Sequence, residues 1–465
     1  MTLNHYQNLV IGSGEAGKVL AWNLAKIGQK TAVVERSMIG GSCPNVACLP
    51  SKNVIYSAKA VSLVDPTSGL GVVAGGLHVD MAGVARRKRK MVEGLIEMHL
   101  GNFKSSGAEL IMGAAHFTEP KTVQVTLNAG GTCLLHGERV FLNLGSRASV
   151  PNVPGLAAAE PMTHVEALNL ERLPDHFVVL GGGYVGLEFA QAMRRFGSRV
   201  TIIQRGPRLL EREDPDVADA LLDLTRDEGI DVFLQAEALK VTGRSGAGVS
   251  VQLRLGTTEK TLEASDILVA AGRTPNTDRL DLAKAHVELD ARGYIRVNEK
   301  LQTSAAGVWA MGDCAGSPQF THVGFDDFRV VMDNLTGGNR TTLGRLVPYC
   351  LFTDPELAHV GLNESEAKAK NLPYRIARLP MAMVLRTRTL SQTRGFVKAL
   401  IGGDDRILGF TAFGAEASEM MAVVQTAMLG GMTYLALRDA IFAHPTASEG
   451  LNSLFANAPS APAPN

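Results

Sequence analysis

The chain has 465 residues, 45% of them hydrophobic and 20% charged, so it is long enough to bury several cores. Lysine plus arginine and aspartate plus glutamate both number 46, and this zero net charge argues against a general nucleic-acid binder. The five cysteines are odd in number and irregularly spaced, which favours a reducing cytoplasm over a secreted disulfide framework. We find no signal peptide and no apolar run of about 18 residues, so we expect no membrane span.

A β-α-β unit is expected at residues 8–35. Its first turn carries the motif G-x-G-x-x-G, with Gly12, Gly14 and Gly17, and its second strand ends at Glu35. Such a turn lets a pyrophosphate approach the amides at a helix N-terminus, and an acid at the strand end can accept hydrogen bonds from a ribose. The unit therefore predicts a dinucleotide site. A glycine-rich turn in an ordinary α/β core is the alternative.

Two cysteines five residues apart, Cys43 and Cys48, follow this unit. In a regular helix such a pair points about 140° apart, so a disulfide between them needs Cys43 in a loop or a distorted first turn. Pro44 is compatible with a first helical position. A helix N-terminus would lower the thiol pKa values and favour the thiolate. Two free buried cysteines are the alternative.

The next segments connect this unit to a second one. Residues 85–105 are expected to be helical, and residues 123–142 to form antiparallel strands. The five charges at 86–90 are interpreted as a solvated helix face, because five charges in a neutral chain do not make a nucleic-acid protein. A proline-containing connector at 150–155 predicts a domain boundary.

A second β-α-β unit occupies residues 177–203. Its three glycines repeat the arrangement of the first unit: Gly181, Gly183 and Gly186. No acid stands at the ribose position, and Arg205 and Arg208 follow the strand instead. A carboxylate would repel a 2′-phosphate, whereas an arginine can pair with one, so the pattern favours NADPH over NADH. The third glycine mildly favours NADH instead. The alternative for the two arginines is that they are solvated surface residues.

The rest of the chain completes an α/β pattern. Residues 230–270 are expected to be rich in strands, and a strand at 307–311 leads into Asp313. The region from about residue 345 mixes strands with helices. The tail 457–465 is rich in alanine and proline, and we expect it to be mobile.

Several motifs together resemble the class I pyridine nucleotide–disulfide oxidoreductases, the family of glutathione reductase, dihydrolipoyl dehydrogenase and mercuric reductase. Residues 40–52, G-G-S-C-P-N-V-A-C-L-P-S-K, are similar to the family's redox-active disulfide segment. Residues 145–147 resemble the stretch that closes its first FAD segment, and 271–276 its G-R-x-P-N motif. Residues 311–315 resemble its second FAD motif, and 444–449 its H-P-T-x-x-E motif. The resemblance covers essentially the whole chain.

The resemblance implies a fold and a division into domains. The fold would be α/β, with two Rossmann-like dinucleotide-binding domains and a C-terminal α+β dimerisation domain. Residues 1–150 and 265–340 would form a split FAD-binding domain, 151–264 the NAD(P)-binding domain and 341–456 the dimerisation domain.

The resemblance also implies a redox-active Cys43–Cys48 disulfide. Cys43 would be the interchange thiol that meets the acceptor, and Cys48 would lie against the flavin. Lys52 would reach towards the flavin and pair with Glu188. Electrons would pass from NADPH or NADH through FAD to this disulfide. The cofactor-binding residues would be Gly12, Gly14, Gly17, Glu35, Gly41, Ser42, Lys52, Gly145, Asp313, Gly181, Gly183, Gly186, Arg205, Arg208 and Gly272.

The C-terminal motif implies a general acid/base. His444 would protonate the leaving thiolate and be oriented by Glu449, and a histidine suits this task because its usual pKa of about 6.5 lies close to working pH. In the family this dyad comes from the partner subunit, so a homodimer is implied. The other cysteines are expected to be buried apolar residues without a metal site: Cys133, Cys314 and Cys350.

Departures from the family pattern bear on the acceptor. Pro44 and Ala47 replace the usual residues around the cysteines, and Phe442 stands where dihydrolipoyl dehydrogenases usually have a histidine. Other stretches, among them 352–362, look most like mercuric-reductase relatives and reactive-chlorine-resistance flavoproteins. The expected acceptor is therefore a disulfide or a soft metal ion such as Hg(II) or Cu(II). A dihydrolipoyl dehydrogenase-like component of a 2-oxo acid dehydrogenase complex and a redox-sensing flavoprotein without turnover remain alternatives.

Overall fold

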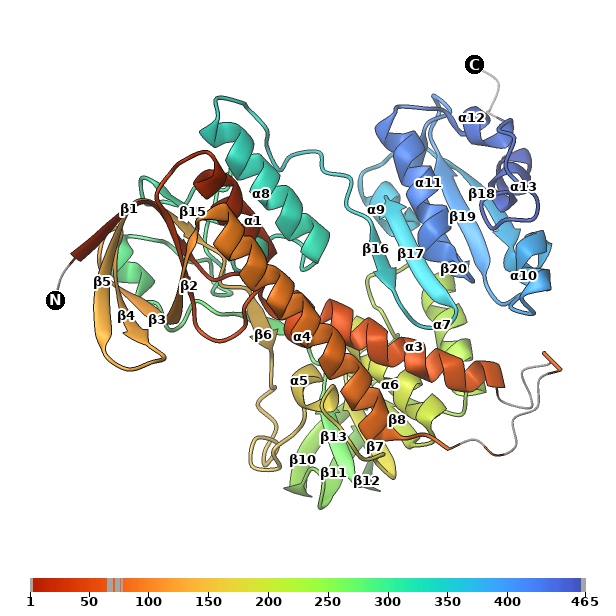
Figure 1. Cartoon of the computed structure of the whole chain (residues 1–465). Helices are drawn as coiled ribbons and strands as arrows, with labels where there is room; N and C mark the ends of the chain where they lie inside the picture. Colours follow the sequence, from red (N-terminus) through yellow and green to blue (C-terminus); the bar gives the residue numbers. More distant parts are fainter. Residues whose placement is uncertain (1–2, 65–69, 72–75, 77, 461–465) are drawn as a thin grey trace.

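The computed structural model describes residues 3–64, 70–71, 76 and 78–460, and Figure 1 shows them as three bodies, each with its own β-structure. We call them the N-terminal, middle and C-terminal bodies. Of the tail that was expected to be mobile, residues 461–465 lie outside the described residues.

The N-terminal body contains one six-stranded sheet: β1 (Leu3–Ile11), β2 (Thr31–Glu35), β3 (Glu109–Glu119), β4 (Thr122–Leu127), β5 (Thr132–Leu142) and β15 (Val308–Ala310). β1 pairs in parallel with β2 and β5, and β15 extends the sheet beyond β5. β4 joins β3 to β5 in antiparallel pairing, as the alternation at 123–142 predicts. Every residue of β2 is buried, which is typical of a parallel strand covered on both faces.

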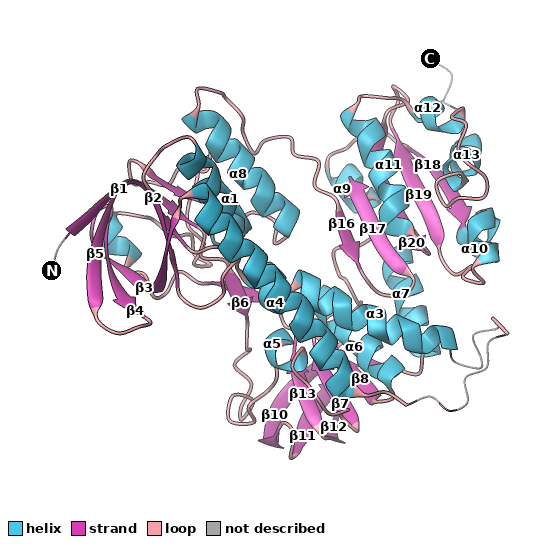
Figure 2. Ribbon diagram, viewed as in Figure 1, coloured by secondary structure: helices cyan, strands magenta, loops and turns pink. Residues whose placement is uncertain are grey.

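Helices cover this sheet and connect it to the middle body (Figure 2). They are α1 (Glu15–Lys26), α2 (Ser42–Val46), α3 (Cys48–Val64), α4 (Met81–Ser106) and α8 (Thr321–Leu335). The Asp80 carboxylate caps α4 by accepting from Gly83 N at 2.9 Å, and Gly107 ends the helix with a left-handed φ of 78°.

The charge run in α4 is not simply a solvated face, so that interpretation is wrong for part of it. Lys88 is buried, and its ammonium donates to Asn169 Oδ1 at 2.6 Å. Arg87 donates to the Asn53 carbonyl of α3 at 2.7 Å. The stem of Lys88 is therefore covered while its charged head finds a partner, whereas Arg87 stays exposed and bonds to the neighbouring helix.

The middle body combines a parallel and an antiparallel sheet. The parallel sheet contains β13 (Asp266–Val269), β7 (His176–Leu180), β8 (Arg199–Ile203) and β9 (Asp231–Phe233), in that order. The antiparallel sheet contains β10 (Ala236–Arg244), β11 (Gly248–Leu255) and β12 (Thr258–Ala264). The helices are α5 (His164–Ala167), α6 (Tyr184–Phe196) and α7 (Pro215–Asp227).

The chain enters and leaves the middle body through paired strands. β6 (Ser146–Ala148) precedes the body and β14 (Arg273–Pro275) follows it, and the two pair in antiparallel fashion. The entry and exit of this body therefore run side by side. A short 3₁₀ helix (Leu282–Ala285) then returns the chain to the N-terminal body, where it packs on β3.

The C-terminal body is an antiparallel sheet with helices. Its strands, in sheet order, are β16 (Tyr349–Leu351), β17 (Glu356–Gly361), β20 (Ile407–Gly414), β19 (Phe396–Ile401) and β18 (Arg375–Pro380). Its helices are α9 (Glu364–Ala369), α10 (Leu385–Thr389), α11 (Ala417–Leu429), α12 (Tyr434–Arg438) and α13 (Gly450–Ala456). The three bodies confirm the predicted fold class, whereas the proposed domain boundaries stay a prediction.

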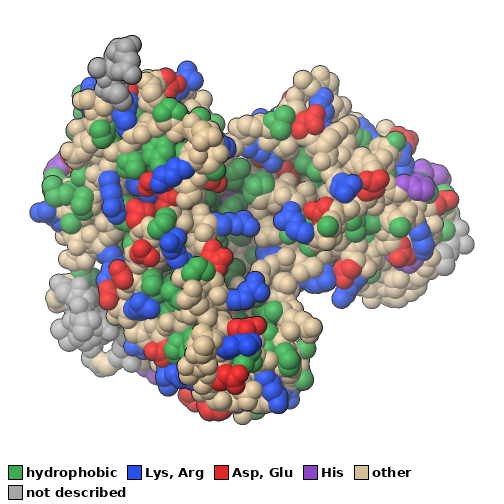
Figure 3. Space-filling model, turned by 180° about the vertical axis from the view of Figure 1, so that it is seen from behind, with side chains coloured by type: hydrophobic (Ala, Val, Ile, Leu, Met, Phe, Trp, Pro, Cys, Tyr) green, Lys and Arg blue, Asp and Glu red, His purple; other side chains and the backbone are tan. Residues whose placement is uncertain are grey.

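Charges of both signs are interspersed on the face seen in Figure 3, as the neutral composition leads one to expect. Among the described residues, no helix has both the length and the apolar character needed to cross a membrane.

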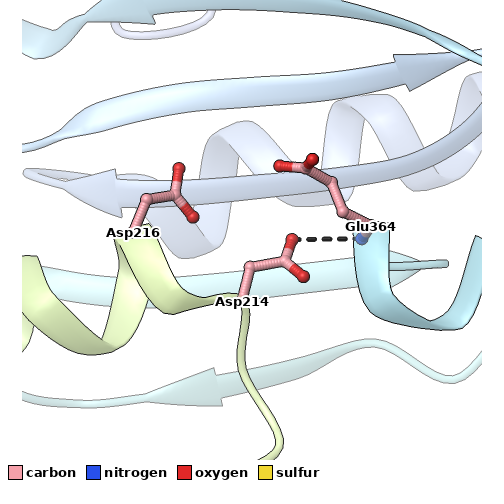
Figure 4. Close-up of side chains that lie close together, drawn as sticks. All are labelled: Asp214, Asp216 and Glu364. Carbon is pink, nitrogen blue, oxygen red and sulfur yellow. Dashed lines mark hydrogen bonds between the residues drawn. The ribbon is translucent and has the colours of Figure 1, made fainter. Parts of the chain in front are cut away.

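A buried ion cluster joins the middle and C-terminal bodies. Figure 4 shows three carboxylates converging from the start of α7 and the start of α9: Asp214, Asp216 and Glu364. The ammonium of Lys398 in β19 lies 2.9 Å from an oxygen of each carboxylate and is 1% exposed. Although burial opposes it, the hydrogen bond from Lys398 holds the pKa of Asp214 below its usual value. The cluster is an internal salt bridge, with a lysine where a cation would sit.

We expect Lys398→Met to lower the free energy of unfolding by about 3 to 5 kcal/mol, because it leaves the buried carboxylate of Asp214 without a counter-charge. Lys368→Met is the matched control, since the exposed Lys368 ammonium lies 3.7 Å from the same Glu364 and should change stability by less than about 0.5 kcal/mol. Urea unfolding of both variants measures the difference. Equal losses would show that Lys398 does not hold the cluster together.

Candidate active site

The first glycine-rich turn packs closely against the end of β5. A Cβ on Gly12 would lie 2.3 Å from the Asn143 carbonyl oxygen, and a Cβ on Gly14 would lie 2.5 Å from Asn143 Oδ1. Asn143 Oδ1 accepts from Gly17 N at 3.0 Å, and its Nδ2 donates to the Met311 carbonyl at 2.9 Å. Asn143 therefore fixes the turn to two neighbouring strands. Sequence reasoning missed this residue, although it directly follows β5.

This turn has the features of an anion cradle. Gly14 precedes α1 without any side-chain cap, and Gly17 N is already bonded to Asn143, so the amides of Glu15 and Ala16 at the start of the helix are the ones placed to face a phosphate. Gly41 packs on Gly14, where a Cβ would lie 2.6 Å from the Gly14 Cα, and Ser42 begins α2 beside it. A Cβ on Gly145 would meet open space. The arrangement fits the pyrophosphate of a dinucleotide such as FAD.

Glu35 stands at the expected strand end, but its carboxylate is already well occupied. One oxygen accepts from Ser13 N at 2.9 Å and Ser13 Oγ at 2.7 Å, and the other accepts from Ser37 N at 2.8 Å and Met38 N at 3.0 Å. A carboxylate has about four acceptor sites, so all are used within the chain. A ribose hydroxyl would have to replace or share one of these bonds.

A second polar group links the FAD motifs. Arg273 Nε donates to Ser146 Oγ at 2.7 Å, and Arg273 Nη2 donates to the Ser146 carbonyl at 2.8 Å. Ser146 Oγ in turn donates to Asp313, which lies in the short 3₁₀ helix after β15. Gly272 precedes this arginine with a φ of 109° and no neighbour where a Cβ would be. Asp313 is thereby held just beyond the end of β15.

The two cysteines lie on either side of a break between helices. α2 ends at Val46, Ala47 adopts φ −131° and ψ −107°, and Cys48 begins α3. Cys43 is the second residue of α2, so it occupies the short first turn that the disulfide geometry requires. Pro44 is the third residue of this helix, not the first as the sequence suggested. Both cysteines are free thiols in the structure.

The two thiols have very different acidities. The hydrogen bond from Cys43 is the main cause that lowers the pKa of Cys48 to about 6, and the Thr321 hydroxyl at 3.3 Å and the charge of Lys52 add to it. The same hydrogen bond, together with burial, raises the pKa of Cys43. The first proton therefore leaves Cys48, whose thiolate is stabilised by Cys43. Thr321 begins α8, far along the chain, and no sequence motif marked it.

Lys52 and Glu188 meet as a near-symmetric ion pair. Lys52 Nζ lies 2.9 Å from both carboxylate oxygens of Glu188, and Glu188 is buried. The backbone amide of Phe352 donates to Glu188 Oε1 at 3.0 Å, and the Phe352 ring centroid lies 4.8 Å from Lys52 Nζ. These groups come from the N-terminal, middle and C-terminal bodies respectively. Sequence reasoning found the ion pair but not Phe352.

Cys43 opens onto a cavity of about 250 Å³ that Cys48 does not line. Trp22 and His99 stack in its wall with ring centroids 5.9 Å apart. Burial lowers the pKa of His99, so the imidazole is neutral at neutral pH. The cavity is lined by Glu15, Lys18, Trp22, Cys43, Pro44, Leu49, Leu95, Met98, His99 and Asn102.

The dyad is formed but stands away from the cysteines of its own chain. His444 Nδ1 lies 3.0 Å from both oxygens of Glu449, and the His444 side chain is 62% exposed. Figure 1 shows α12 and α13, which flank His444, on the far side of the C-terminal body from α3. Ile441, three residues earlier, is fully exposed. The dyad thus lies at an exposed surface, close in sequence to an uncovered apolar side chain and away from α3, which carries Cys48.

The second glycine-rich turn repeats the first in the middle body. A Cβ on Gly181 would lie 2.5 Å from the Ala270 carbonyl, and one on Gly186 would lie 2.1 Å from the Gly181 carbonyl. Gly183 precedes α6 without a side-chain cap and borders open space. This turn also fits a pyrophosphate. Arg205 and Arg208 are exposed, and neither forms an ion pair with another described residue.

Of the remaining cysteines, Cys314 is buried as expected, and burial raises its pKa to about 12. Cys133 and Cys350 are only half-buried, so the expectation was wrong for these two. Cys133 is the second residue of β5, near the end of the strand, and Cys350 lies on β16, the edge strand of its sheet.

Comparison with known families accounts for nearly the whole chain. The sequence model of the pyridine nucleotide-disulphide oxidoreductase family matches residues 6–327, and that of the family's dimerisation domain matches residues 347–455. The chain belongs to the pyridine nucleotide-disulphide oxidoreductase family, and it is an enzyme of that class. Membership implies FAD and NAD(P)H as cofactors and supplies a C-terminal dimerisation domain.

Relatives place the chain within this family. It is 35% identical over 460 residues to RclA of Escherichia coli, a probable pyridine nucleotide-disulfide oxidoreductase, covering 97% of this chain and 99% of that protein. The structure of the Cu(II) complex of that HOCl-induced flavoprotein disulfide reductase matches with a TM-score of 0.88 over 97% of this chain and 99% of that one. A mercuric reductase of Staphylococcus aureus is 30% identical over 96% of this chain and 81% of its own length.

We expect Lys52→Met to raise the pKa of Cys48 and so to slow its alkylation. At present the thiolate forms above about pH 6, and losing the ammonium shifts this onset upward, so at pH 7 the iodoacetamide rate at Cys48 should fall about twofold. Peptide mass spectrometry of the reduced chain measures the rate at each pH. Lys90→Met, on the exposed face of α4, is the control. An unchanged pH profile in Lys52→Met would contradict the assigned cause.

Proposed function

We propose that the chain reduces an electron acceptor through a Cys43–Cys48 dithiol, using electrons that NAD(P)H delivers by way of FAD. One observation carries this proposal: the thiol of Cys43 lines a cavity that Cys48 does not line, whereas the thiol of Cys48 is the acidic one, stabilised by Cys43, Thr321 and the charge of Lys52. The pair therefore has one sulfur for the acceptor and one that ionises first.

The first glycine-rich turn and Asp313 would hold FAD. The second glycine-rich turn would hold the nicotinamide nucleotide. When bound, the flavin supplies hydride acceptance from NAD(P)H and two-electron transfer to a disulfide. Lys52 would keep the Cys48 thiolate ionised and orient it, while Glu188 keeps Lys52 in place. We propose NADPH as the preferred donor, because Arg205 and Arg208 are free to pair with a 2′-phosphate.

For a disulfide acceptor the net reaction is NAD(P)H + H⁺ + RSSR → NAD(P)⁺ + 2 RSH. His444 takes the proton of the Cys43 thiol as its sulfur attacks one acceptor sulfur, the acceptor S–S bond breaks, and His444 gives the proton to the first leaving thiolate. Cys48 then attacks the mixed disulfide, which releases the second thiol and forms the Cys43–Cys48 bond. Hydrogen bonding to Glu449 orients the imidazole for this transfer.

A soft metal ion is the second acceptor class. The net reactions are NAD(P)H + Hg(II) → NAD(P)⁺ + H⁺ + Hg(0), and NAD(P)H + 2 Cu(II) → NAD(P)⁺ + H⁺ + 2 Cu(I). The Cu(II) complex of the RclA flavoprotein favours copper within this class. Among the described residues, three Cys, His, Asp or Glu donor atoms come together only at the lysine-filled acid cluster. A metal at Cys43 would therefore be bound by the two thiolates or with help from a partner subunit.

We further propose a homodimer in which His444 of one subunit serves the cysteines of the other. The separation of the dyad from its own cysteines and the exposed Ile441 support this arrangement. The split FAD-binding region 1–150 with 265–340, the NAD(P)-binding region 151–264 and the dimerisation region 341–456 are part of the same proposal. The free thiols suit a cytoplasmic protein.

Two alternatives receive less support. A dihydrolipoyl dehydrogenase-like role is opposed by Phe442 at the position of the usual histidine, although a dihydrolipoyl dehydrogenase of Geobacillus stearothermophilus is 31% identical over 95% of this chain and 94% of its own length. A sensor without turnover was suggested by Pro44 and Ala47. Pro44 lies within α2 and Ala47 in the break between α2 and α3, and neither separates the two thiols, which remain hydrogen-bonded.

Cys43→Ser should abolish NADPH-dependent reduction of the acceptor, because the sulfur that receives the acceptor is gone, and should leave flavin bound. The matched control is Cys133→Ser, which removes a half-buried thiol from β5 and should keep full activity. Steady-state oxidation of NADPH with a disulfide, Hg(II) or Cu(II) as acceptor measures the loss. Full turnover in Cys43→Ser with the acceptor that serves the wild type would overturn the proposal.

Mixed dimers test the shared site. Neither Cys43→Ser nor His444→Ala homodimers should turn over a disulfide at more than a small fraction of the wild-type rate. Dimers with one subunit of each kind should regain about half, because one of the two sites then combines intact cysteines with an intact histidine. If each subunit used its own His444, both sites would be defective and the mixed dimer would stay inactive.

A further inference from the structure

The two β-α-β units of the chain place different side chains at the same position. Glu35 and Gln204 lie at the same separation along the chain from the first glycine of their motifs. Each accepts a hydrogen bond from the amide that follows this glycine: Ser13 N to Glu35 Oε2 at 2.9 Å, and Gly182 N to Gln204 Oε1 at 2.9 Å. Gln204 therefore occupies the acid's position with a neutral amide.

A carboxylate from a later segment of the chain nevertheless lies next to Gln204. Gln204 Nε2 donates to Glu211 Oε1 at 2.9 Å. The segment between them folds back over the turn, because Leu210 N donates to the Gly182 carbonyl at 3.1 Å. Glu211 Oε1 fills the space beside Gly206, where a Cβ would lie 1.3 Å from it. The sequence pattern does not mark this acid, because Glu211 lies seven residues after Gln204, the position at which a ribose-binding acid is expected.

The segment that follows β8 therefore carries charges of both signs. Arg205 and Arg208 bring two positive charges that pair with no other described residue, and Glu211 brings one negative charge whose side chain is fixed by Gln204 and Gly206. A carboxylate accepts hydrogen bonds from a ribose 2′-hydroxyl and repels a 2′-phosphate, whereas a guanidinium attracts the phosphate. The preference between NADPH and NADH therefore depends on the carboxylate of Glu211 and on the two guanidinium groups together.

We propose that Glu211 is a specificity-determining residue of the nucleotide site, which limits the preference for NADPH and lets the enzyme use NADH as well. This inference rests on the proposed NAD(P)H-dependent function and on the second glycine turn as the nucleotide site. Gln204 acts as a positioning residue: its Oε1 is committed to Gly182, so its Nε2 must point to Glu211. Arg205 and Arg208 supply the attraction that Glu211 opposes.

The first test is Glu211→Gln, which removes the charge and keeps the shape. Isothermal titration of the FAD-loaded enzyme with NADP⁺ and NAD⁺ measures affinity without any acceptor, so a failure of the Cys43 chemistry does not affect it. We expect NADP⁺ to bind about tenfold more tightly, which is about 1.4 kcal/mol, and NAD⁺ to change by less than about threefold. The gain should shrink as salt rises from low to high ionic strength, because exposed charges are screened.

Three further variants separate charge from structure. Glu211→Asp keeps the charge and should stay within about threefold of the wild type for NADP⁺. The double variant Gln204→Glu/Glu211→Gln moves the carboxylate to the position that Glu35 has in the first unit, and should restore discrimination against NADP⁺. Glu259→Gln, in β12 of the antiparallel sheet, removes an exposed acid elsewhere in the same body and should change neither affinity.

The outcomes are distinct. A tenfold, salt-sensitive gain confined to NADP⁺ supports the proposal. Equal changes for NADP⁺ and NAD⁺ in Glu211→Gln, or no change, would overturn it. If neither nucleotide binds the wild type, the proposed nucleotide site itself fails, and this differs from a failure of Glu211 to discriminate.

Discussion

The ion pair between Lys52 and Glu188 is the contact on which the arrangement of the site depends. A buried carboxylate without a partner costs several kcal/mol, so Glu188 in α6 holds α3 at a fixed distance from the middle body. Phe352 closes the arrangement from the C-terminal body through its amide and its ring. Because Cys48 lies one helical turn before Lys52, the same contact fixes the acidic thiol and supplies part of the positive charge that makes it acidic.

The local motifs could be predicted because their residues lie close together in the sequence: the glycine turns, the cysteine pair and the dyad of His444 with Glu449. The pairing of Lys52 with the distant Glu188 could be predicted only from the family pattern. The fold class followed from them.

Other parts of the site depend on contacts between distant segments. Asn143, Thr321 and Phe352 each act through a neighbour more than a hundred residues away, and nothing in their own surroundings marks them. The burial of Lys88 was missed for the same reason, since its partner Asn169 belongs to another body. Glu35 shows the reverse case: its position was right, but the donors that fill its carboxylate come from the turn and the loop around it.

The pairing of β6 with β14 has a consequence for how such a protein can change. The middle body begins and ends at two adjacent antiparallel strands, so its two ends lie next to each other at the surface of the N-terminal body. A segment with neighbouring ends can be exchanged for another of the same kind without displacing the rest of the chain, which is how inserted domains are tolerated. Recombination or grafting could thus replace the whole middle body at two short joints, provided that the incoming segment also supplies a carboxylate where Glu188 meets Lys52.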